Sequence, residues 1–490
     1  MASASCLPFH PPLIPLASEP PSPVAADAAT TETAFHEAPP REVAYYGAAQ
    51  VPGELMGGMF NVMIHPILNM TLGVNPAIIG ILLLIRGLWD AFTDPLMAYF
   101  SDNFKSRWGR RRPFILVGGL AMILFGALAW YIPRGLGEMQ IAWYFGIVMI
   151  LFATAQTVYS VPYFAFGIEL SPTYNGRTRV AAVRTFFSRL AALSAPWLFP
   201  FCTLAIFSDA AEGARWLVVL LALVSLPAIL LGSLKTKERM TVSPTPRESF
   251  LAALKGMVSN VHFLRVTTIY ALLLFVFGVF GAMQSYIGIY YVVGGDLQYG
   301  ALLGGIGGTI GSVLGILCIP LMDWLSRRIQ KHHALNVAVI TMLLGTFTTW
   351  WLFTPVYPWL SVFVGVIYSL GVAAIFTVLP SLHADVIDFD EYQTGQRREG
   401  MLGAAAAFLM KTSQAVGAGI SGFLITWTGF DVALGGEQSE QTFTLMRLIY
   451  AVGASIPLIP VILILFKYPL TEAKVHEVQA KLAERKAAQA

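Results

Sequence analysis

Long apolar stretches separated by short polar breaks fill most of this chain. A helix that crosses the hydrocarbon core of a bilayer needs roughly 20 mostly apolar residues, and such stretches recur from about residue 44 to residue 467. Six are expected near 44–70, 76–101, 113–132, 141–168, 181–207 and 215–233, and six near 264–293, 299–323, 334–354, 358–382, 400–427 and 442–467. The pattern predicts an all-α membrane protein with twelve transmembrane helices in two six-helix halves.

Three segments interrupt this pattern. Residues 1–42 are rich in Pro, Ala, Ser, Thr and Glu, a composition that predicts a disordered tail, and they lack the basic start and apolar centre of a secretory signal. A polar linker at 234–262 is expected to separate an N-terminal half at 43–233 from a C-terminal half at 263–467. Residues 468–490 are charged and are expected to form an exposed helix at the C-terminal end.

The distribution of Lys and Arg predicts the orientation. Basic residues gather in the loops after spans two, four, six, eight and ten, at Lys105, Arg107, Arg110, Arg111, Arg112, Arg177, Arg179, Lys235, Lys237, Arg239, Arg247, Arg327, Arg328, Lys331, Arg397 and Arg398. The opposite loops hold only Arg134 and Arg215. Because basic loops stay on the cytoplasmic side, both termini are expected in the cytoplasm of a multi-pass protein of the cell (inner) membrane.

A short repeat supports the division into two halves. Pro95-Leu96-Met97, at the end of span two, recurs as Pro320-Leu321-Met322 at the end of span eight, and a basic loop follows each copy. Two related halves around a central site are typical of secondary transporters.

Composition argues against a soluble protein, a metal site and nucleic-acid binding. The 490 residues are 56% hydrophobic and 12% charged, whereas soluble domains carry about 25% charged residues. The three cysteines show no metal-ligand spacing, and no cofactor is expected. A net charge of +3 argues against nucleic acid as a partner, which leaves the lipid bilayer and small solutes.

Span two contains acidic residues that a lipid-facing helix would exclude. An ionised side chain at bilayer depth costs roughly 2.5–3.5 kcal/mol, yet Arg86, Asp90 and Asp94 follow one another at intervals of four and share one helix face. Two carboxylates one turn apart repel unless a cation or the arginine neutralises them. Na⁺, a hard cation, prefers oxygen ligands, which the carboxylates and the hydroxyl of Thr93 or Thr157 could supply.

A structural alternative is an Arg86–Asp90 pair that only fixes helix packing. In the register of the repeat, the second half has Gly315 and Ile319 where the first has Asp90 and Asp94. The fold therefore does not require acids there, which favours a cation-binding role for Asp90 and Asp94.

Three more charged residues lie within predicted spans: Glu54 in span one, Arg184 in span five and Lys411 in span eleven. Charged groups that donate and accept strong hydrogen bonds suit a cargo with many hydroxyls. The alternative for Lys411 is a structural ion pair with one of the aspartates.

The sequence resembles the glycoside–pentoside–hexuronide:cation symporters, the branch of the major facilitator superfamily that includes melibiose permease. The resemblance spans about residues 44–467 and is carried by Trp89–Met97, Ser101-Asp102, Arg107–Pro113, Val161–Tyr163, Arg177–Arg179, Arg184, Ala384–Asp388, Thr394–Gly400 and Lys411.

This resemblance implies roles for individual residues. Asp90, Thr93, Asp94 and Thr157 correspond to the family's cation site, and Lys411 to its lysine near that site. Glu54 and Arg184 match the acid and the arginine that contact sugar. The segment of Asp102 and Arg110, Arg111 and Arg112 looks like the superfamily's gating loop.

The sugar-binding residues depart from the pattern at two positions. Ser160 stands where melibiose permease has an aspartate that binds galactosyl hydroxyls, and Phe164 replaces the stacking tryptophan. The cation site matches the family, whereas the specificity for galactosides does not carry over.

The sequence thus predicts a Na⁺- or H⁺-coupled symporter for a sugar or glycoside that works by alternating access. Alternatives are a lysophospholipid carrier on the same fold and a non-transporting membrane sensor. A membrane-embedded enzyme would need a nucleophile–base or metal set, and the sequence shows neither.

Overall fold

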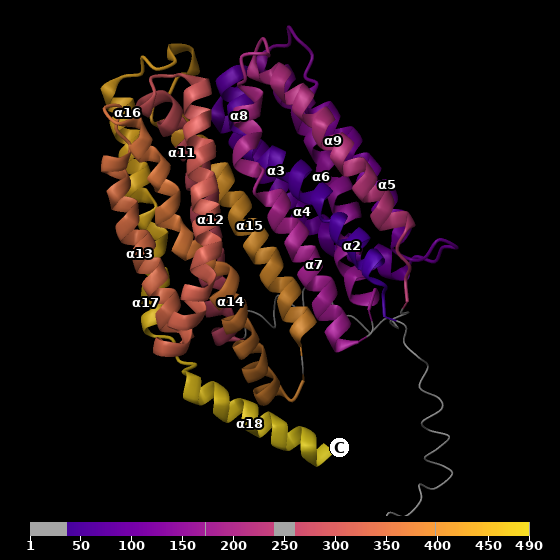
Figure 1. The fold of residues 1–490 in the computed structure, drawn as a ribbon. Coiled ribbons are helices and arrows are strands. Elements are labelled where there is room, and N and C mark those ends of the chain that lie inside the picture. Colours follow the sequence, from indigo (N-terminus) through magenta and orange to yellow (C-terminus); the bar gives the residue numbers. More distant parts are fainter. Residues whose placement is uncertain (1–36, 172, 240–259, 397, 490) are drawn as a thin grey trace, which may run out of the picture.

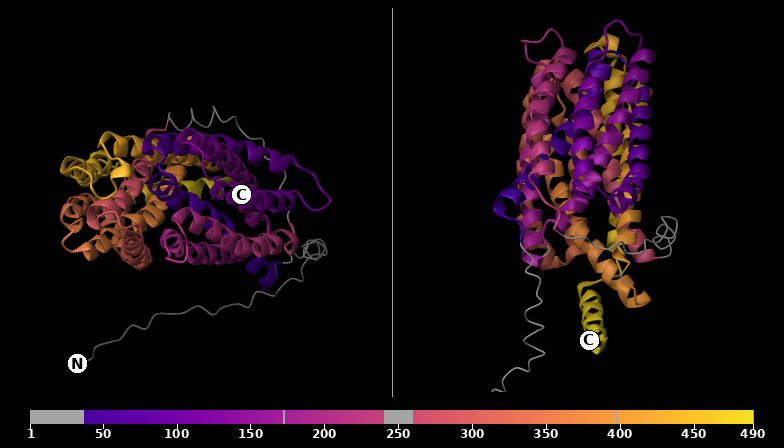
Figure 2. Two further views of the ribbon diagram at one scale, coloured as in Figure 1. Left: turned by 90° about the horizontal axis from the view of Figure 1, so that it is seen from above. Right: turned by 90° about the vertical axis from the view of Figure 1, so that its right-hand side faces the viewer.

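The computed structural model describes residues 37–171, 173–239, 260–396 and 398–489, and almost all of them belong to helices. Figure 1 shows two groups of long helices. The group coloured indigo to magenta runs from α2 to α9, and the group coloured salmon to yellow runs from α11 to α17. Seen from above, the groups form two neighbouring lobes (Figure 2).

The helix bounds follow the apolar stretches. The first group consists of α2 (Pro40–Ala48), α3 (Val51–His65), the π-helix η1 (Pro66–Thr71), α4 (Pro76–Asn103), α5 (Arg112–Trp130), α6 (Glu138–Glu169), α7 (Tyr174–Ala192), the 3₁₀-helix η2 (Ala195–Trp197), α8 (Leu198–Cys202) and α9 (Ala210–Leu234). The second consists of α11 (Val261–Tyr286), η3 (Ile287–Val292), α12 (Leu297–Ile329), α13 (Lys331–Leu352), η4 (Pro358–Phe363), α14 (Val364–Thr394), α15 (Glu399–Trp427), η5 (Val432–Leu434), α16 (Glu440–Leu448), η6 (Ile449–Gly453) and α17 (Ser455–Phe466). A last helix, α18 (Glu472–Gln489), follows.

Within the described ranges, nine helices are long and apolar enough to cross a bilayer. The other three predicted spans correspond to α2–α3–η1, α7–η2–α8 and α15, so the architecture agrees with the predicted all-α membrane fold and is consistent with twelve spans. Of these, α3 has only 15 residues because span one is interrupted, α7 carries four arginines, and α15 carries Lys411.

Two predicted spans are interrupted helices. Span one breaks between α2 and α3, just before Pro52, and ends in the π-helix that begins at Pro66. Span five stops at Ala192 and resumes as η2, which contains Pro196. Proline lacks the N–H that an α-helix needs and disfavours helical geometry in the preceding residue, so these breaks follow from the sequence.

Capping side chains fix where several helices begin. The Asn75 side chain accepts a hydrogen bond from the backbone N–H of Ala77 at 2.9 Å, and Pro76 occupies the first position of α4. Asp296 caps α12 by accepting from the N–H of Tyr299 at 2.9 Å. Such caps satisfy N–H groups that have no partner inside the helix.

We call the end of the bundle where α18 lies the α18 end, and the opposite end, where α8 lies, the α8 end (Figure 1). The two groups make direct hydrogen bonds near the α8 end. The Tyr286 hydroxyl of α11 donates to Asn69 of η1 at 2.8 Å. The Trp197 indole N–H of η2 donates to Thr309 of α12 at 2.9 Å. This end of the structure is closed.

Glycines allow the close approach there. A side chain on Gly422 of α15 would collide with the Pro76 carbonyl of α4, and one on Gly80 with the Gly419 carbonyl. Because α4 and α15 belong to different groups, their backbones meet directly, as small residues permit in membrane helix packing.

The segments at the two ends and in the middle are only partly described. Most of the predicted tail at 1–42 and of the linker at 234–262 lies outside the described residues. The stretch after residue 468 does form a charged, largely exposed helix, α18. Gln479 of α18 donates to Asp388 of α14 at 3.2 Å, and Lys486 pairs with Glu391 at 3.1 Å, which holds α18 against the end of α14.

Candidate functional site

The first cluster of predicted site residues joins α4, α6 and α15. The Thr157 hydroxyl donates to a carboxylate oxygen of Asp94 at 3.0 Å, and its oxygen lies 3.4 Å from that of Thr93. The ammonium group of Lys411 forms an ion pair with the other Asp94 oxygen. Residues that the sequence places 317 positions apart therefore meet between the two groups of helices.

Asp90 lies one turn before Asp94 on α4 and is half-buried. Its carboxylate has no hydrogen bond or ion pair with any residue in the described part of the chain. Arg86 instead donates to Gln156 at 3.2 Å. The guanidinium carbon also lies 5.2 Å from the centre of the Phe60 ring. The Arg86–Asp90 pair considered as a structural alternative is not formed within 4 Å, whereas the pair between Lys411 and an aspartate is.

The ion pair of Asp94 and Lys411 is not sealed from solvent. The Asp94 side chain is 26% exposed and the Lys411 side chain 45% exposed. A partly hydrated pair costs less to open than a buried one, because water replaces the lost partner. The arrangement is therefore one in which a cation from solution can compete with the lysine for the carboxylate.

The predicted sugar-contacting residues lie on α3, α6 and α7. The Glu54 carboxylate accepts hydrogen bonds from Ser188 of α7 at 2.6 Å and from Gln50 at 3.0 Å. The guanidinium carbon of Arg184 lies 5.0 Å from the centre of the exposed Phe164 ring. The face of an aromatic ring attracts a guanidinium. The Phe164 ring and the Arg184 charge therefore lie side by side, where one ligand could contact both.

The structure does not gather all predicted substrate residues in one place. Ser160 precedes Phe164 by one turn of α6, on the same side of the bundle as Glu54 and Arg184. Lys411, also predicted to bind substrate, contacts Asp94 instead. The sugar-contacting candidates other than Lys411 therefore belong to the first group of helices, and Lys411 belongs to the cation cluster.

The predicted gating residues form an ion-pair network between α4, α5 and α6. Arg111 pairs with Asp102 at 3.0 Å and with Glu169 at 3.1 Å, and Arg110 also pairs with Glu169. Burial lowers the pKa of the Arg111 guanidinium, and the facing carboxylates of Glu169 and Asp102 oppose that shift. Arg112 donates to the Ser233 carbonyl at 2.6 Å. These contacts of the arginines remain within the first group of helices.

Sequence reasoning missed two acidic residues of this network. Glu169 lies at the end of α6, one residue beyond the predicted end of span four. Glu238 lies in the predicted linker, and its carboxylate accepts from the backbone N–H groups of Arg110, Arg111 and Arg112 at 2.7, 2.8 and 3.3 Å. The free N–H groups at the start of α5 indicate that an acceptor is needed there. The sequence does not show that Glu238 supplies it, because Glu238 is far from α5 along the chain.

Replacing Glu238 with Ala should lower the melting temperature of the purified protein by about 1 °C, because the start of α5 loses its capping carboxylate at a cost of about 1 kcal/mol. Glu238→Gln keeps one acceptor oxygen, so its melting temperature should fall less than that of Glu238→Ala. Gly109, with a φ of +104°, lies so close to Glu238 that an added side chain would collide with it. Gly109→Ala should therefore lower the melting temperature as Glu238→Ala does, because the added methyl group displaces the Glu238 carboxylate. An unchanged melting temperature in Glu238→Ala would refute the capping role.

Comparison with known proteins decides the family. The profile of the family described as MFS/sugar transport protein matches residues 45–472. The chain belongs to this family. It is a multi-pass membrane transporter and not an enzyme, as the resemblance to major facilitator symporters predicted.

Relatives and a solved structure agree with this assignment. The chain is 23% identical to the glucuronide carrier protein homolog of Escherichia coli (strain K12), over 85% of this chain and 90% of that protein. It is 24% identical to the sodium-dependent lysophosphatidylcholine symporter 1 of Gallus gallus, over 82% and 81%. The crystal structure of the D323A mutant of the nucleoside transporter NupG superposes with a TM-score of 0.62 at 12% identity, over 87% of this chain and all of that chain, which shows a shared fold.

Proposed function

We propose that this family member is a cation-coupled symporter of a sugar or glycoside. The contact that carries the proposal is the ion pair between Asp94 and Lys411, because it places a carboxylate with adjacent hydroxyls on the boundary between the two groups of helices. A charge at that boundary can link ion binding to a relative movement of the two groups.

In this proposal the coupling ion, Na⁺ or H⁺, binds at Asp90 and Asp94. The hydroxyls of Thr93 and Thr157 supply further oxygen ligands if the ion is Na⁺, which prefers oxygen. Binding displaces Lys411 from Asp94 and so weakens one contact between the groups. A cation therefore changes the free-energy difference between two conformations, which is the requirement for coupling.

The cargo site in this proposal consists of Glu54, Ser160, Phe164 and Arg184. A carboxylate and a guanidinium bind sugar hydroxyls through charge-assisted hydrogen bonds, and an exposed aromatic ring offers a flat surface for the apolar face of a sugar. Rocking of the two halves would then open the site to each side in turn. Because coupling is reciprocal, the sugar must also tighten cation binding.

The proposal includes a location. The basic loops at the α18 end indicate that this end and both termini face the cytoplasm, and the closed α8 end then faces outward across the cell (inner) membrane. The gating residues Asp102, Arg110, Arg111 and Arg112 would lie on the cytoplasmic side.

Reconstitution tests the proposal. Purified protein in liposomes should accumulate at least one radiolabelled sugar or glycoside from a panel when either a Na⁺ gradient or a pH gradient is imposed. The gradient that works identifies the ion, and an ionophore that collapses it should abolish accumulation. A protein that only equilibrates every sugar under both gradients would not be a symporter.

A second candidate is a lysophospholipid carrier. The lysophosphatidylcholine symporter among the relatives and the absence of an acid at Ser160 favour it. Accumulation of a lysophospholipid, with no response to sugars in the same liposomes, would select this candidate.

A further inference from the structure

A pocket on the outer side of the first group of helices contains an arginine, Arg107, that the proposed mechanism does not use. The pocket lies at the α18 end, where the membrane span of α5 begins at Arg112 and that of α9 ends at Leu234. The residues that line it are Arg107, Trp108, Arg112, Leu116, Ser233 and Leu234. We call it the α5–α9 pocket.

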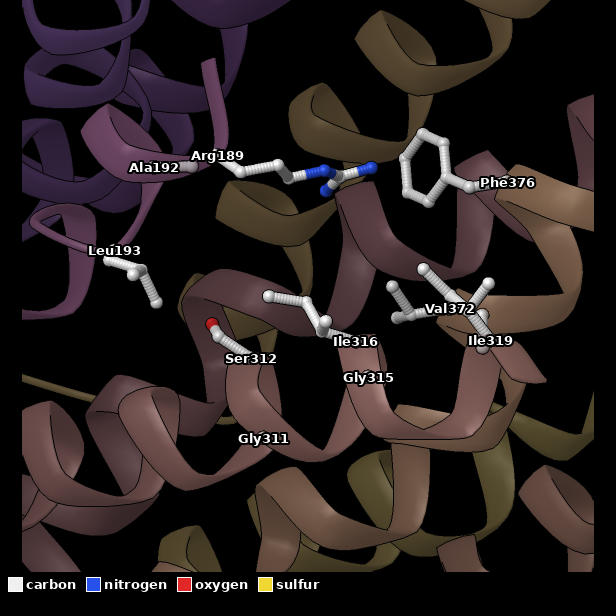
Figure 3. Close-up of a pocket in the computed structure, with 11 residues that line it drawn as sticks. Arg189, Ala192, Leu193, Gly311, Ser312, Gly315, Ile316, Ile319, Val372 and Phe376 are labelled. Atoms are coloured by element: carbon white, nitrogen blue, oxygen red, sulfur yellow. The ribbon is translucent and has the colours of Figure 1, made fainter. Parts of the chain in front are cut away.

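The α5–α9 pocket is distinct from the pocket between the two groups of helices. Figure 3 shows that inner pocket, across which Arg189 of α7 extends toward the Phe376 ring of α14. It lies at the boundary where the proposed mechanism moves the cargo. In contrast, α5 and α9 lie side by side at the edge of the first group that is farther from the second group (Figure 1). The α5–α9 pocket therefore faces the surrounding bilayer and not the path of the cargo.

Arg107 has no partner in the described part of the chain. Its side chain is exposed, and no hydrogen bond or ion pair joins it to another described residue. The neighbouring Trp108 is 62% exposed. Tryptophan is enriched at the level of the lipid headgroups, where its ring contacts apolar chains and its N–H meets polar groups. Together the two side chains present an unpaired cation and an amphipathic ring at the membrane surface.

The second arginine of the pocket is held in place by the end of α9. The Nε–H group of Arg112 donates to the Ser233 carbonyl at 2.6 Å, and its Nη2 group donates to the Leu234 carbonyl at 2.9 Å. The last carbonyls of a helix have no partner inside the helix, so Arg112 also has a structural role. Its Nη1 group donates to no residue in the described ranges and remains available to an anion.

The surface around the α5–α9 pocket is basic. Three further basic side chains adjoin the lining residues in the chain, are exposed and make no ion pair with a described residue, namely Lys105, Lys235 and Lys237. The nearby acids are already bound. Glu238 accepts hydrogen bonds from the backbone N–H groups at the start of α5, and the acids of the gating network pair with its arginines. This surface should therefore attract anions.

Exposed apolar side chains continue from the pocket toward the interior of the bilayer. Leu120 and Leu124 follow Leu116 at intervals of four along α5, and Leu230 precedes Leu234 by four on α9. Side chains four residues apart share one face of a helix, and Leu120, Leu124 and Leu230 are all exposed. Cations at the membrane surface are thus followed by an apolar surface, which is the order of polar and apolar parts in a phospholipid.

We propose that the α5–α9 pocket binds an anionic phospholipid from the bilayer leaflet at the α18 end. The phosphate accepts hydrogen bonds from Arg107 and Arg112, because the N–H groups of a guanidinium match the spacing of phosphate oxygens. The acyl chains lie along Leu120 and Leu230. Basic pockets between membrane helices bind anionic headgroups in this way. A zwitterionic lipid is disfavoured, because its positive group would lie against Lys235.

Lipid binding to the purified and delipidated full chain in detergent tests the proposal, with native mass spectrometry as the measurement of affinity. The probes are dioleoyl phosphatidylglycerol and dioleoyl phosphatidylcholine, which have the same acyl chains. The wild type should bind one phosphatidylglycerol roughly tenfold more tightly than phosphatidylcholine, the factor expected for hydrogen bonds to a charged group. Arg107→Gln should remove most of this preference, since the choline group already neutralises the phosphate of the other lipid.

Two further variants separate the pocket from a general attraction of basic residues to anionic lipid. Arg328→Gln removes an exposed arginine at the same end, beside Trp324, that does not line the pocket, and it should leave both affinities unchanged. Leu234→Asp places an acid in the wall of the pocket and should weaken phosphatidylglycerol roughly tenfold. Leu234→Asn changes the shape in the same way without a charge and should weaken it less.

Three results would overturn the proposal. Equal affinity for the two lipids would show that the pocket does not select an anion. Equal losses in Arg107→Gln and Arg328→Gln would show that only the surface charge attracts the lipid. Displacement of phosphatidylglycerol by inorganic phosphate would show that the pocket binds a free anion. Because none of these measurements involves cargo or a gradient, they are independent of the proposed transport.

Discussion

Asp94→Asn should abolish gradient-driven accumulation of the cargo, so that the final internal concentration in proteoliposomes only equals the external one. Asn keeps an oxygen for the Thr157 hydroxyl, which donates to Asp94 at 3.0 Å, so helix packing persists. It lacks the negative charge that a cation needs and leaves the charge of Lys411 unpaired. Exchange of labelled for unlabelled cargo, which needs no net ion movement, should continue.

A matched control is Asp323→Asn. Asp323 lies on α12, the counterpart of α4, and its exposed carboxylate pairs with Arg327 at 3.0 Å. Exposed pairs of this kind contribute about 0–1 kcal/mol, so accumulation should remain at the wild-type level. Equal accumulation by wild type and Asp94→Asn would remove Asp94 from the cation site.

A double variant distinguishes cation binding from a purely structural ion pair. Lys411→Gln alone leaves Asp94 without its counter-charge. If the pair only holds α4 against α15, the combination of Asp94→Asn with Lys411→Gln removes both charges and should restore transport. If Asp94 binds the coupling ion, the double variant should remain unable to accumulate cargo, which is the result we expect.

Much of the fold follows from apolar length alone. Stretches of about 20 apolar residues leave few arrangements other than membrane-spanning helices, and the prolines account for the breaks in spans one and five. Charged residues inside spans were also recognisable, because each is costly and needs a partner. Asp94 and Lys411 are recognisable in this way, whereas Thr157 is recognisable only as a hydroxyl that could join the carboxylates as an oxygen ligand.

The sequence does not show which of these residues pair with each other. Hydropathy gives the depth of a residue in the membrane but not the direction in which its side chain points. Glu169 was missed because the predicted span ended at residue 168, and Glu238 because its partners belong to a distant helix.

Glu169→Gln should destabilise the protein more than any other single change in the gating network. The Glu169 side chain is 2% exposed and pairs with Arg110 and Arg111, and the Arg111 side chain is itself only 8% exposed. Removing one partner from a buried pair costs about 3–5 kcal/mol, because the remaining charge stays desolvated. The melting temperature of the purified protein should fall by about 3–5 °C.

Asp102→Asn is the control within the same network. Asp102 pairs with Arg111 at 3.0 Å but is 19% exposed, and Arg111 keeps Glu169 when Asp102 loses its charge. The melting temperature should therefore fall by less than half as much as in Glu169→Gln. A larger loss in Asp102→Asn than in Glu169→Gln would mean that the solvent-facing acid, rather than the buried one, holds the arginines between α4, α5 and α6.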